Sequence, residues 1–194
     1  MDSRPPLLLV HGYGDTGALF DWLRPRLSRA GREVHTLDLQ PNDARQGLEP
    51  LARQIQTWID RMGSETPIDL VGFSMGGLVS RYWLQRLGGL ERCRRFVSIA
   101  SPHRGTWTAF GPQHRGAQQM RPGSEFLTDL NRDAQRLAEV DFCSLWTPLD
   151  LMILPADSSV LPGLPDQRLW EPWHAGMVCS TSVADWLADY LDRP

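Results

Sequence analysis

The sequence of 194 residues contains no lysine, so all 20 of its cationic residues are arginine. This absence excludes a phosphate-binding loop built on lysine, a Schiff base and a serine–lysine dyad. Only three cysteines are present, Cys93, Cys143 and Cys179, and their spacing does not match a zinc site or a redox pair. We therefore expect reduced structural thiols, no metal and no cofactor.

Long apolar runs and blocks of one charge are also missing. No stretch is long enough to span a bilayer and no signal peptide is visible, which predicts a cytoplasmic protein with no integral membrane segment. The net charge is −3 and the arginines are scattered, so no nucleic-acid partner is expected. Apolar residues make up 41% of the chain, and its length fits one domain over residues 1–194. The sequence leaves the oligomeric state unknown.

What the sequence does contain is an alternation of short apolar runs with segments of helical periodicity. The apolar runs predict strands over 7–10, 34–39, 68–73, 96–100, 141–146 and 168–171. The periodic segments predict helices over 17–30, capped by Asp15 or Thr16, over 48–62, 75–87 and 124–137, and from a cap at Ser180 or Thr181 to the end. This order predicts an α/β fold with a mostly parallel sheet and helices on both faces. The loop-like connection after Ser101 is too short for a large cap, so we expect a minimal cap or none.

The segment Val71–Gly77 combines a Gly-x-Ser-x-Gly pattern with a strand before it and a helix after it. A serine at such a sharp turn is held in a strained backbone, with its hydroxyl exposed above the sheet edge. The flanking glycines permit the close approach of strand and helix. The helix then directs its unpaired N–H groups and positive dipole end toward charge forming near Ser74. The alternative is an ordinary glycine-rich turn between a core strand and a core helix.

Three further polar residues follow predicted strands, where open parallel sheets bind their ligands. They are His11, Asp150 and His174. Ser74, Asp150 and His174 follow one another in the chain order Ser, Asp, His, which is the order described for nucleophile-elbow hydrolases. A serine hydroxyl needs an adjacent base to remove its proton, and a histidine with a pKa near 7 can take and return that proton. An aspartate then fixes the imidazole tautomer.

Other histidines compete for the role of base. His103 also lies at a strand end and is the main rival of His174, which the chain order favours. His11 directly precedes Gly12, and we expect it to hold that loop. His35 lies within a strand and is interpreted as structural, whereas His114 lies in an irregular loop and is interpreted as solvated.

The acid and the oxyanion donors also have candidates. Asp150 lies nearer to a strand end than its competitor Asp157 does. A tetrahedral intermediate needs two N–H donors, and the backbone amides of Met75 and Tyr13 are in position to supply them.

Four segments, 8–12, 72–77, 98–106 and 147–153, resemble those of α/β-hydrolase lipases and esterases, in particular the small bacterial triacylglycerol lipases with little or no lid. The resemblance implies Ser74 as nucleophile, Asp150 as acid and His174 as base, with Tyr13 and Met75 as oxyanion donors. It also implies hydrolysis of carboxylic esters with apolar acyl chains, so that the partner is a small ester or lipid. Trp173 replaces the glycine that commonly precedes the histidine.

Several apolar residues fall in loops expected to border the site. We hypothesise that Trp107, Leu161, Leu164 and Trp173 help to line an acyl groove, since ligand sites are largely apolar. Ordinary core packing is the alternative for each of them. For the function, the alternatives are an acyl thioesterase or other acyl hydrolase with the same triad, and a catalytically silent fold that serves as a binding module.

Overall fold

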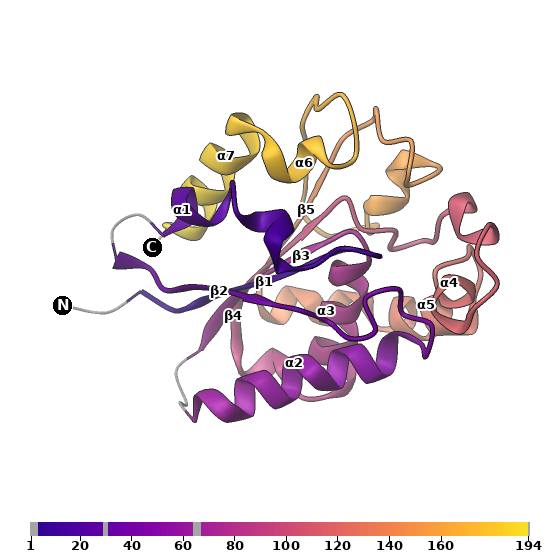
Figure 1. Cartoon of the computed structure of the whole chain (residues 1–194), viewed down its shortest axis with the longest axis horizontal. Coiled ribbons are helices and arrows are strands. Elements are labelled where there is room, and N and C mark those ends of the chain that lie inside the picture. Colours follow the sequence, from indigo (N-terminus) through magenta and orange to yellow (C-terminus); the bar gives the residue numbers. More distant parts are fainter. Residues whose placement is uncertain (1–3, 29–30, 64–66, 194) are drawn as a thin grey trace.

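The computed structural model describes residues 4–28, 31–63 and 67–193, and within them six strands form one parallel sheet (Figure 1). The strand order is β2-β1-β3-β4-β5-β6. The strands are β1 (Leu7–Val10), β2 (Val34–Leu37), β3 (Ile68–Phe73), β4 (Cys93–Ile99), β5 (Asp141–Trp146) and β6 (Asp166–Arg168). The prediction of a mostly parallel sheet is confirmed. Because β1 and β3 are neighbours, the loops after them emerge side by side.

Helices cover both faces of the sheet, as predicted (Figure 1). One face carries α2 (Leu48–Met62), α3 (Met75–Arg86), α5 (Glu125–Arg132) and η5 (Ala134–Glu139). The other face carries η1 (Gly17–Phe20), α1 (Arg24–Leu27), α6 (Gly176–Cys179) and α7 (Thr181–Leu191). No described helix has the length and apolar character needed to cross a membrane.

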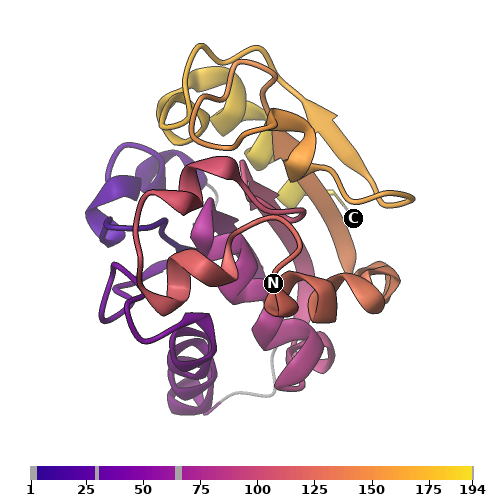
Figure 2. The ribbon, with the colours of Figure 1, turned by 90° about the vertical axis from the view of Figure 1, so that its right-hand side faces the viewer.

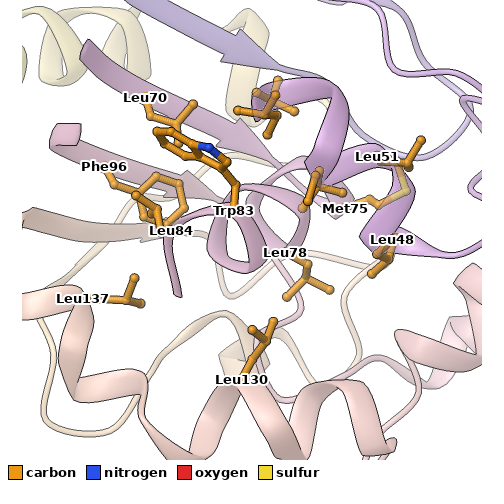
Figure 3. Packing of buried hydrophobic residues seen from close by; sticks show 14 of the residues in the cluster. Leu48, Leu51, Leu70, Met75, Leu78, Trp83, Leu84, Phe96, Leu130 and Leu137 are labelled. Carbon is orange, nitrogen blue, oxygen red and sulfur yellow. The ribbon is translucent and has the colours of Figure 1, made fainter. Parts of the chain in front are cut away.

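The core consists of two buried clusters, one on each side of the sheet. Alternate residues of β1 divide between them: Leu8 and Val10 join the α2–α3 side, and Leu7 and Leu9 join the α7 side. Figure 3 shows the first cluster, in which Trp83 of α3 lies among leucines from several elements. A strand that is buried on both faces has to be apolar at every position, which explains the unbroken apolar run of β1.

Two predicted helices are interrupted. The helix expected over 17–30 is instead η1 followed by α1, because Pro25 lacks an N–H and lies in the first turn of a new helix. Residues 29 and 30 of that prediction lie outside the described residues. The helix expected over 124–137 ends at Arg132, and the chain continues from Ala134 as η5.

Other boundaries also differ from the prediction. The last strand is Asp166–Arg168 rather than 168–171, in register with Ser144–Trp146 of β5. Ser180 does occupy the residue before α7, but its hydroxyl donates to Glu171 Oε1 at 2.6 Å instead of capping the helix. The loop-like stretch after Ser101 contains η4 (Trp107–Phe110) and α4 (Arg115–Gln119), two short helices whose sequences are too brief to show periodicity.

A buried ionic cluster lies at the amino ends of β3 and β4. Asp69, which is fully buried, accepts hydrogen bonds from Arg32 Nη1 at 2.5 Å and from Arg94 Nε at 2.9 Å. The carbonyl oxygen of Leu191 accepts from Arg32 Nη2 at 2.9 Å and from Arg95 Nη1 at 2.6 Å. The carboxyl end of α7 is therefore bonded to the edge of the sheet opposite to the edge that Ser74 follows.

Candidate active site

Ser74 lies at the sharp turn between β3 and α3. Its backbone has φ 53° and ψ −121°, a left-handed conformation that L-residues rarely adopt. The turn is fixed by a hydrogen bond of 2.7 Å from Ser74 N–H to the carbonyl oxygen of Ile99 in the neighbouring strand. The strained turn places the Ser74 side chain in the lining of a pocket.

The glycines around Ser74 are needed for close packing of the backbone. A Cβ on Gly72 would lie 2.7 Å from Gly77 Cα, and one on Gly76 would lie 2.5 Å from the carbonyl oxygen of His11. Neither neighbour is a flexible side chain that could move away. The glycines therefore allow α3 to begin directly against β1 and β3.

Asp150 and His174 form a hydrogen-bonded pair. Asp150 Oδ2 lies 2.7 Å from His174 Nδ1, and Asp150 Oδ1 accepts from the N–H groups of Met152 at 2.8 Å and Ile153 at 2.9 Å. The Asp150 side chain is buried, so its two oxygens have fixed partners. A carboxylate can only accept, which makes Nδ1 the protonated nitrogen and leaves a lone pair on Nε2.

His174 lies beside the serine turn. Its ring centroid is 4.7 Å from that of Phe73, the residue before Ser74. The loop that carries His174 is tied to the loop that carries Asp150 by a hydrogen bond of 2.8 Å from Thr147 Oγ1 to the carbonyl oxygen of Glu171. Ser74 and His174 both line the same pocket.

The loop after β1 brings a backbone amide to the same place. A Cβ on Gly12 would lie 3.2 Å from Ser74 Cβ, so this loop passes directly over the serine. The N–H groups of Tyr13 and Met75 donate to no other residue that the structure describes. Tyr13 directly follows Gly12, and Met75 directly follows Ser74, so both of these amides belong to the two segments that meet at the serine.

His11 holds the loop after β1, as expected. Its Nε2 accepts from Leu39 N–H at 2.8 Å, which requires Nδ1 to carry the proton and to donate to the carbonyl oxygen of Gly12, also at 2.8 Å. Both ring nitrogens are occupied and the side chain is fully buried. His11 is thus a structural residue of the loop.

The pocket above Ser74 has a volume of about 510 Å³ and is lined mainly by apolar groups. Its walls come from the loop after β1, the η4–α4 segment, the loop after β5 and the loop that carries His174. Figure 2 views this side of the molecule, where these segments gather. The lining includes Tyr13, Leu19, Phe73, Pro102, Ala109, Ala117, Met120, Met152, Ile153 and Trp173.

Of the four apolar residues proposed for an acyl groove, only Trp173 is in this lining. Leu161 and Leu164 are buried in the core cluster on the α3 side, so the expectation that they border the site is not met. The turn that carries them folds back onto η5, where Gln135 Nε2 donates to the carbonyl oxygen of Pro162 at 3.0 Å. Trp107 is exposed and stacks on Phe110, with ring centroids 5.3 Å apart.

The rival base and the rival acid are both engaged elsewhere. His103 is fully buried, its Nε2 lies 2.8 Å from Ser98 Oγ, and its Nδ1 lies 3.3 Å from Arg81 Nη1. Burial, together with the charge of Arg81, lowers the pKa of His103 well below its usual value. Asp157 forms an exposed ion pair with Arg104 at 2.7 Å.

Two side chains, one in the pocket lining and one bonded to a residue of that lining, have contacts that the sequence does not predict. The sequence predicts a solvated His114, but its Nε2 lies 2.9 Å from Tyr13 Oη and its Nδ1 accepts from Ala117 N–H at 3.3 Å. The sequence indicates Asp15 only as a helix cap, but Asp15 lines the pocket. Thr16 is the residue before η1 and makes no side-chain cap. Neither role has a local pattern in the sequence. Within the described parts of the chain, no three His, Cys, Asp or Glu side chains form a cluster that could hold a metal ion.

The family model for the α/β hydrolase fold matches residues 5–191, and the chain belongs to this family. Its relatives include pimeloyl-[acyl-carrier protein] methyl ester esterases. That of Photobacterium profundum is 30% identical over 132 residues, covering 65% of this chain and 50% of the relative, and that of Shewanella oneidensis is 36% identical over 78 residues, covering 39% and 28%. The chain thus spans half or less of the length of these curated relatives.

Solved structures give the same fold at low identity. The mature lipase BlEst2 of Bacillus licheniformis has a TM-score of 0.77 and 14% identity, covering 98% of this chain and 93% of that one. Lipase B of Aspergillus fumigatus has a TM-score of 0.82 and 16% identity, covering 98% and 53%. These likenesses establish the arrangement of the sheet and helices.

Proposed function

We propose that the protein is a serine hydrolase of carboxylic esters, with Ser74 as nucleophile, His174 as base and Asp150 as orienting acid. The observation that carries the proposal is the Asp150–His174 hydrogen bond of 2.7 Å beside the strained Ser74 turn, at one pocket. This arrangement has the parts that acyl transfer needs: a nucleophile, a base held in one tautomer, and two amide donors.

The residues then act in sequence. His174 Nε2 takes the proton of Ser74 Oγ as that oxygen bonds to the ester carbonyl carbon, and the oxyanion accepts from the N–H groups of Tyr13 and Met75. His174 Nε2 next gives its proton to the departing alcohol oxygen, which leaves an acyl group on Ser74. A water molecule then adds to the acyl carbon and gives a proton to His174 Nε2. The bond from that carbon to Ser74 Oγ breaks, and His174 returns the proton to Ser74 Oγ, which releases the carboxylic acid and regenerates the serine.

The pocket favours an apolar acyl chain, because aliphatic side chains such as Ala117, Met120 and Ile153 form much of its wall. The alternative substrate class is an acyl thioester, which the same residues could cleave. The named relatives are ester hydrolases, and this supports the oxygen ester. Turnover of p-nitrophenyl butyrate compared with butyryl-coenzyme A measures the preference, and faster thioester turnover would favour the alternative.

The proposal is tested with Ser74→Ala and with an organophosphate. We expect Ser74→Ala to lose about a millionfold in kcat with the fold retained, and the organophosphate to add covalently to Ser74 of the wild type. Ser28→Ala is the matched control, since Ser28 Oγ donates to the carbonyl oxygen of Arg24 and is not in the described lining of the pocket. Wild-type activity in Ser74→Ala, or no labelling of the folded protein, would reject the proposal and leave the silent binding fold.

A further inference from the structure

Asp15 supplies the only carboxylate in the pocket lining that the structure describes. A Cβ on Gly12 would lie 3.0 Å from Asp15 Oδ2 and 3.2 Å from Ser74 Cβ. Because both atoms lie near this one point, the distance from Asp15 Oδ2 to Ser74 Cβ cannot exceed the sum of these two distances. One small substrate group bound at Ser74 would also reach Asp15.

The carboxylate of Asp15 accepts no hydrogen bond from any residue that the structure describes. The backbone around it is held in place by a hydrogen bond of 3.0 Å from Asn42 Nδ2 to the carbonyl oxygen of Asp15. The side chain is half-buried, and burial raises its pKa against the opposing influence of His11 and His174. A charge that costs solvation and makes no internal bond is typical of a group that contacts a ligand.

The position of Asp15 identifies the part of the substrate that it faces. Asp15 and His174 both line this pocket, and the Asp15 carboxylate lies close to Ser74. In the proposed reaction, which this inference assumes, His174 protonates the departing alcohol. Because Ala117 and Met120 belong to the aliphatic wall that suits the acyl chain, the carboxylate of Asp15 suits the other, alcohol part of the ester.

We propose that Asp15 is a specificity-determining residue that accepts a hydrogen bond from a free hydroxyl group on the alcohol part of the substrate. A carboxylate accepts and does not donate, so it distinguishes a hydroxyl donor from an aliphatic group and repels an anion. The preferred substrates are partial esters of polyols with an apolar acyl chain. Esters whose alcohol part carries a carboxylate or phosphate next to the ester bond are poor substrates.

The test compares two esters that differ only in hydroxyl groups, glyceryl monobutyrate and propyl butyrate, by their kcat/KM values. We expect the wild type to prefer the glyceryl ester, and Asp15→Ala to reduce this preference about tenfold or more, because a hydrogen bond to a charged group has that magnitude. Asp15→Asn, which keeps the size and one acceptor, should reduce it less. Asp21→Asn removes an equal charge from an exposed position on the same segment and should leave the ratio unchanged.

The ratio separates this proposal from the proposed function. If both Asp15 variants cleave propyl butyrate and keep the wild-type ratio, or if they lose both esters to the same extent, the specificity role is rejected and ester hydrolysis stands. If the wild type cleaves neither ester and the organophosphate does not label Ser74, both proposals are rejected. Near-native circular dichroism of each variant shows that it has folded.

Discussion

Tyr13 and His114, 101 positions apart in the chain, stack with their ring planes 8° apart and share a hydrogen bond of 2.9 Å between Tyr13 Oη and His114 Nε2. This contact joins the loop that offers a candidate oxyanion donor to the η4–α4 segment on the opposite wall of the pocket. Because His114 Nδ1 already accepts from Ala117 N–H, Nε2 carries the proton and donates to the phenol.

We predict that Tyr13→Phe lowers kcat for a butyrate ester several-fold, since a neutral hydrogen bond contributes about 1 kcal/mol. His114→Phe should have a similar effect, and the double variant should be no worse than either single variant, because all three remove the same bond. Kinetics of the three variants make up the double-mutant cycle. Fully additive losses would show that the two side chains act independently.

Asp150 is the next residue whose role can be isolated. Asp150→Asn keeps the shape of the side chain but offers an N–H or an amide oxygen to His174, which disturbs the tautomer, and we predict that kcat falls about 10⁴-fold. Near-native circular dichroism would show that the fold is kept. Asp157→Asn, which breaks only the exposed ion pair with Arg104, is the control. A loss of activity in the control that equals the loss in Asp150→Asn would contradict the assignment.

Gly76 tests the steric argument for the serine turn. A Cβ at this position would meet the carbonyl oxygens of Val10 and His11, so Gly76→Ala should lower the free energy of unfolding by about 1–3 kcal/mol or more and reduce activity. Gly111→Ala is the matched control for Gly76→Ala, because a Cβ at Gly111 would meet the carbonyl oxygen of Thr108 at the ordinary contact distance of 3.5 Å. Urea unfolding of both variants measures the difference. Equal stability of the two would show that the turn can relax.

The lowered pKa of the buried His103 predicts that the free energy of unfolding depends on pH. Its pKa lies well below the usual value of about 6.5 in the folded protein, so below this pH the unfolded chain binds a proton that the folded chain does not. The free energy of unfolding should therefore fall as the pH drops below about 6.5, by up to about 1.4 kcal/mol per pH unit from this group. Burial lowers the pKa of Arg81 to about 9, so its charge stays constant over this range.

The measurement compares wild type and His103→Gln by urea unfolding at pH 7 and pH 5. Carboxylates contribute to both proteins alike, so the difference in slope isolates His103. We expect the variant to be less stable at pH 7 and to lose less stability on acidification. An identical slope in both proteins would mean that His103 is protonated in the folded state.

The sequence predicts the centre of the molecule better than its margins, for physical reasons. Strand β1 is apolar at every position because both of its faces are buried, and this pattern is visible without a structure. The turn at Ser74 is equally visible, because only glycine fits where β3 and α3 cross. Asp150 and His174 each follow a strand. Because the carboxyl ends of parallel strands lie at the same edge of the sheet, the sequence also predicts that these two residues lie at that edge.

The pocket walls were harder to predict because they depend on contacts between distant loops. Nothing local indicates that Leu161 and Leu164 fold inward onto the core, whereas Trp173 faces the pocket. The partnership of Tyr13 with His114 likewise depends on how two loops meet. The sequence indicates a helix N-cap at Asp15, because aspartate is among the residues most favoured at that position.

The ionic cluster around Asp69 has a practical consequence. It fastens Leu191 to the amino ends of β3 and β4, and Arg4 is bonded to Asp192 at 2.7 Å in the same region. A surface tether attached at residue 193 would thus hold the protein at the bonded end of α7, with the mouth above Ser74 facing away from the support. Immobilised in this orientation, the protein could be screened against ester libraries without the matrix blocking entry.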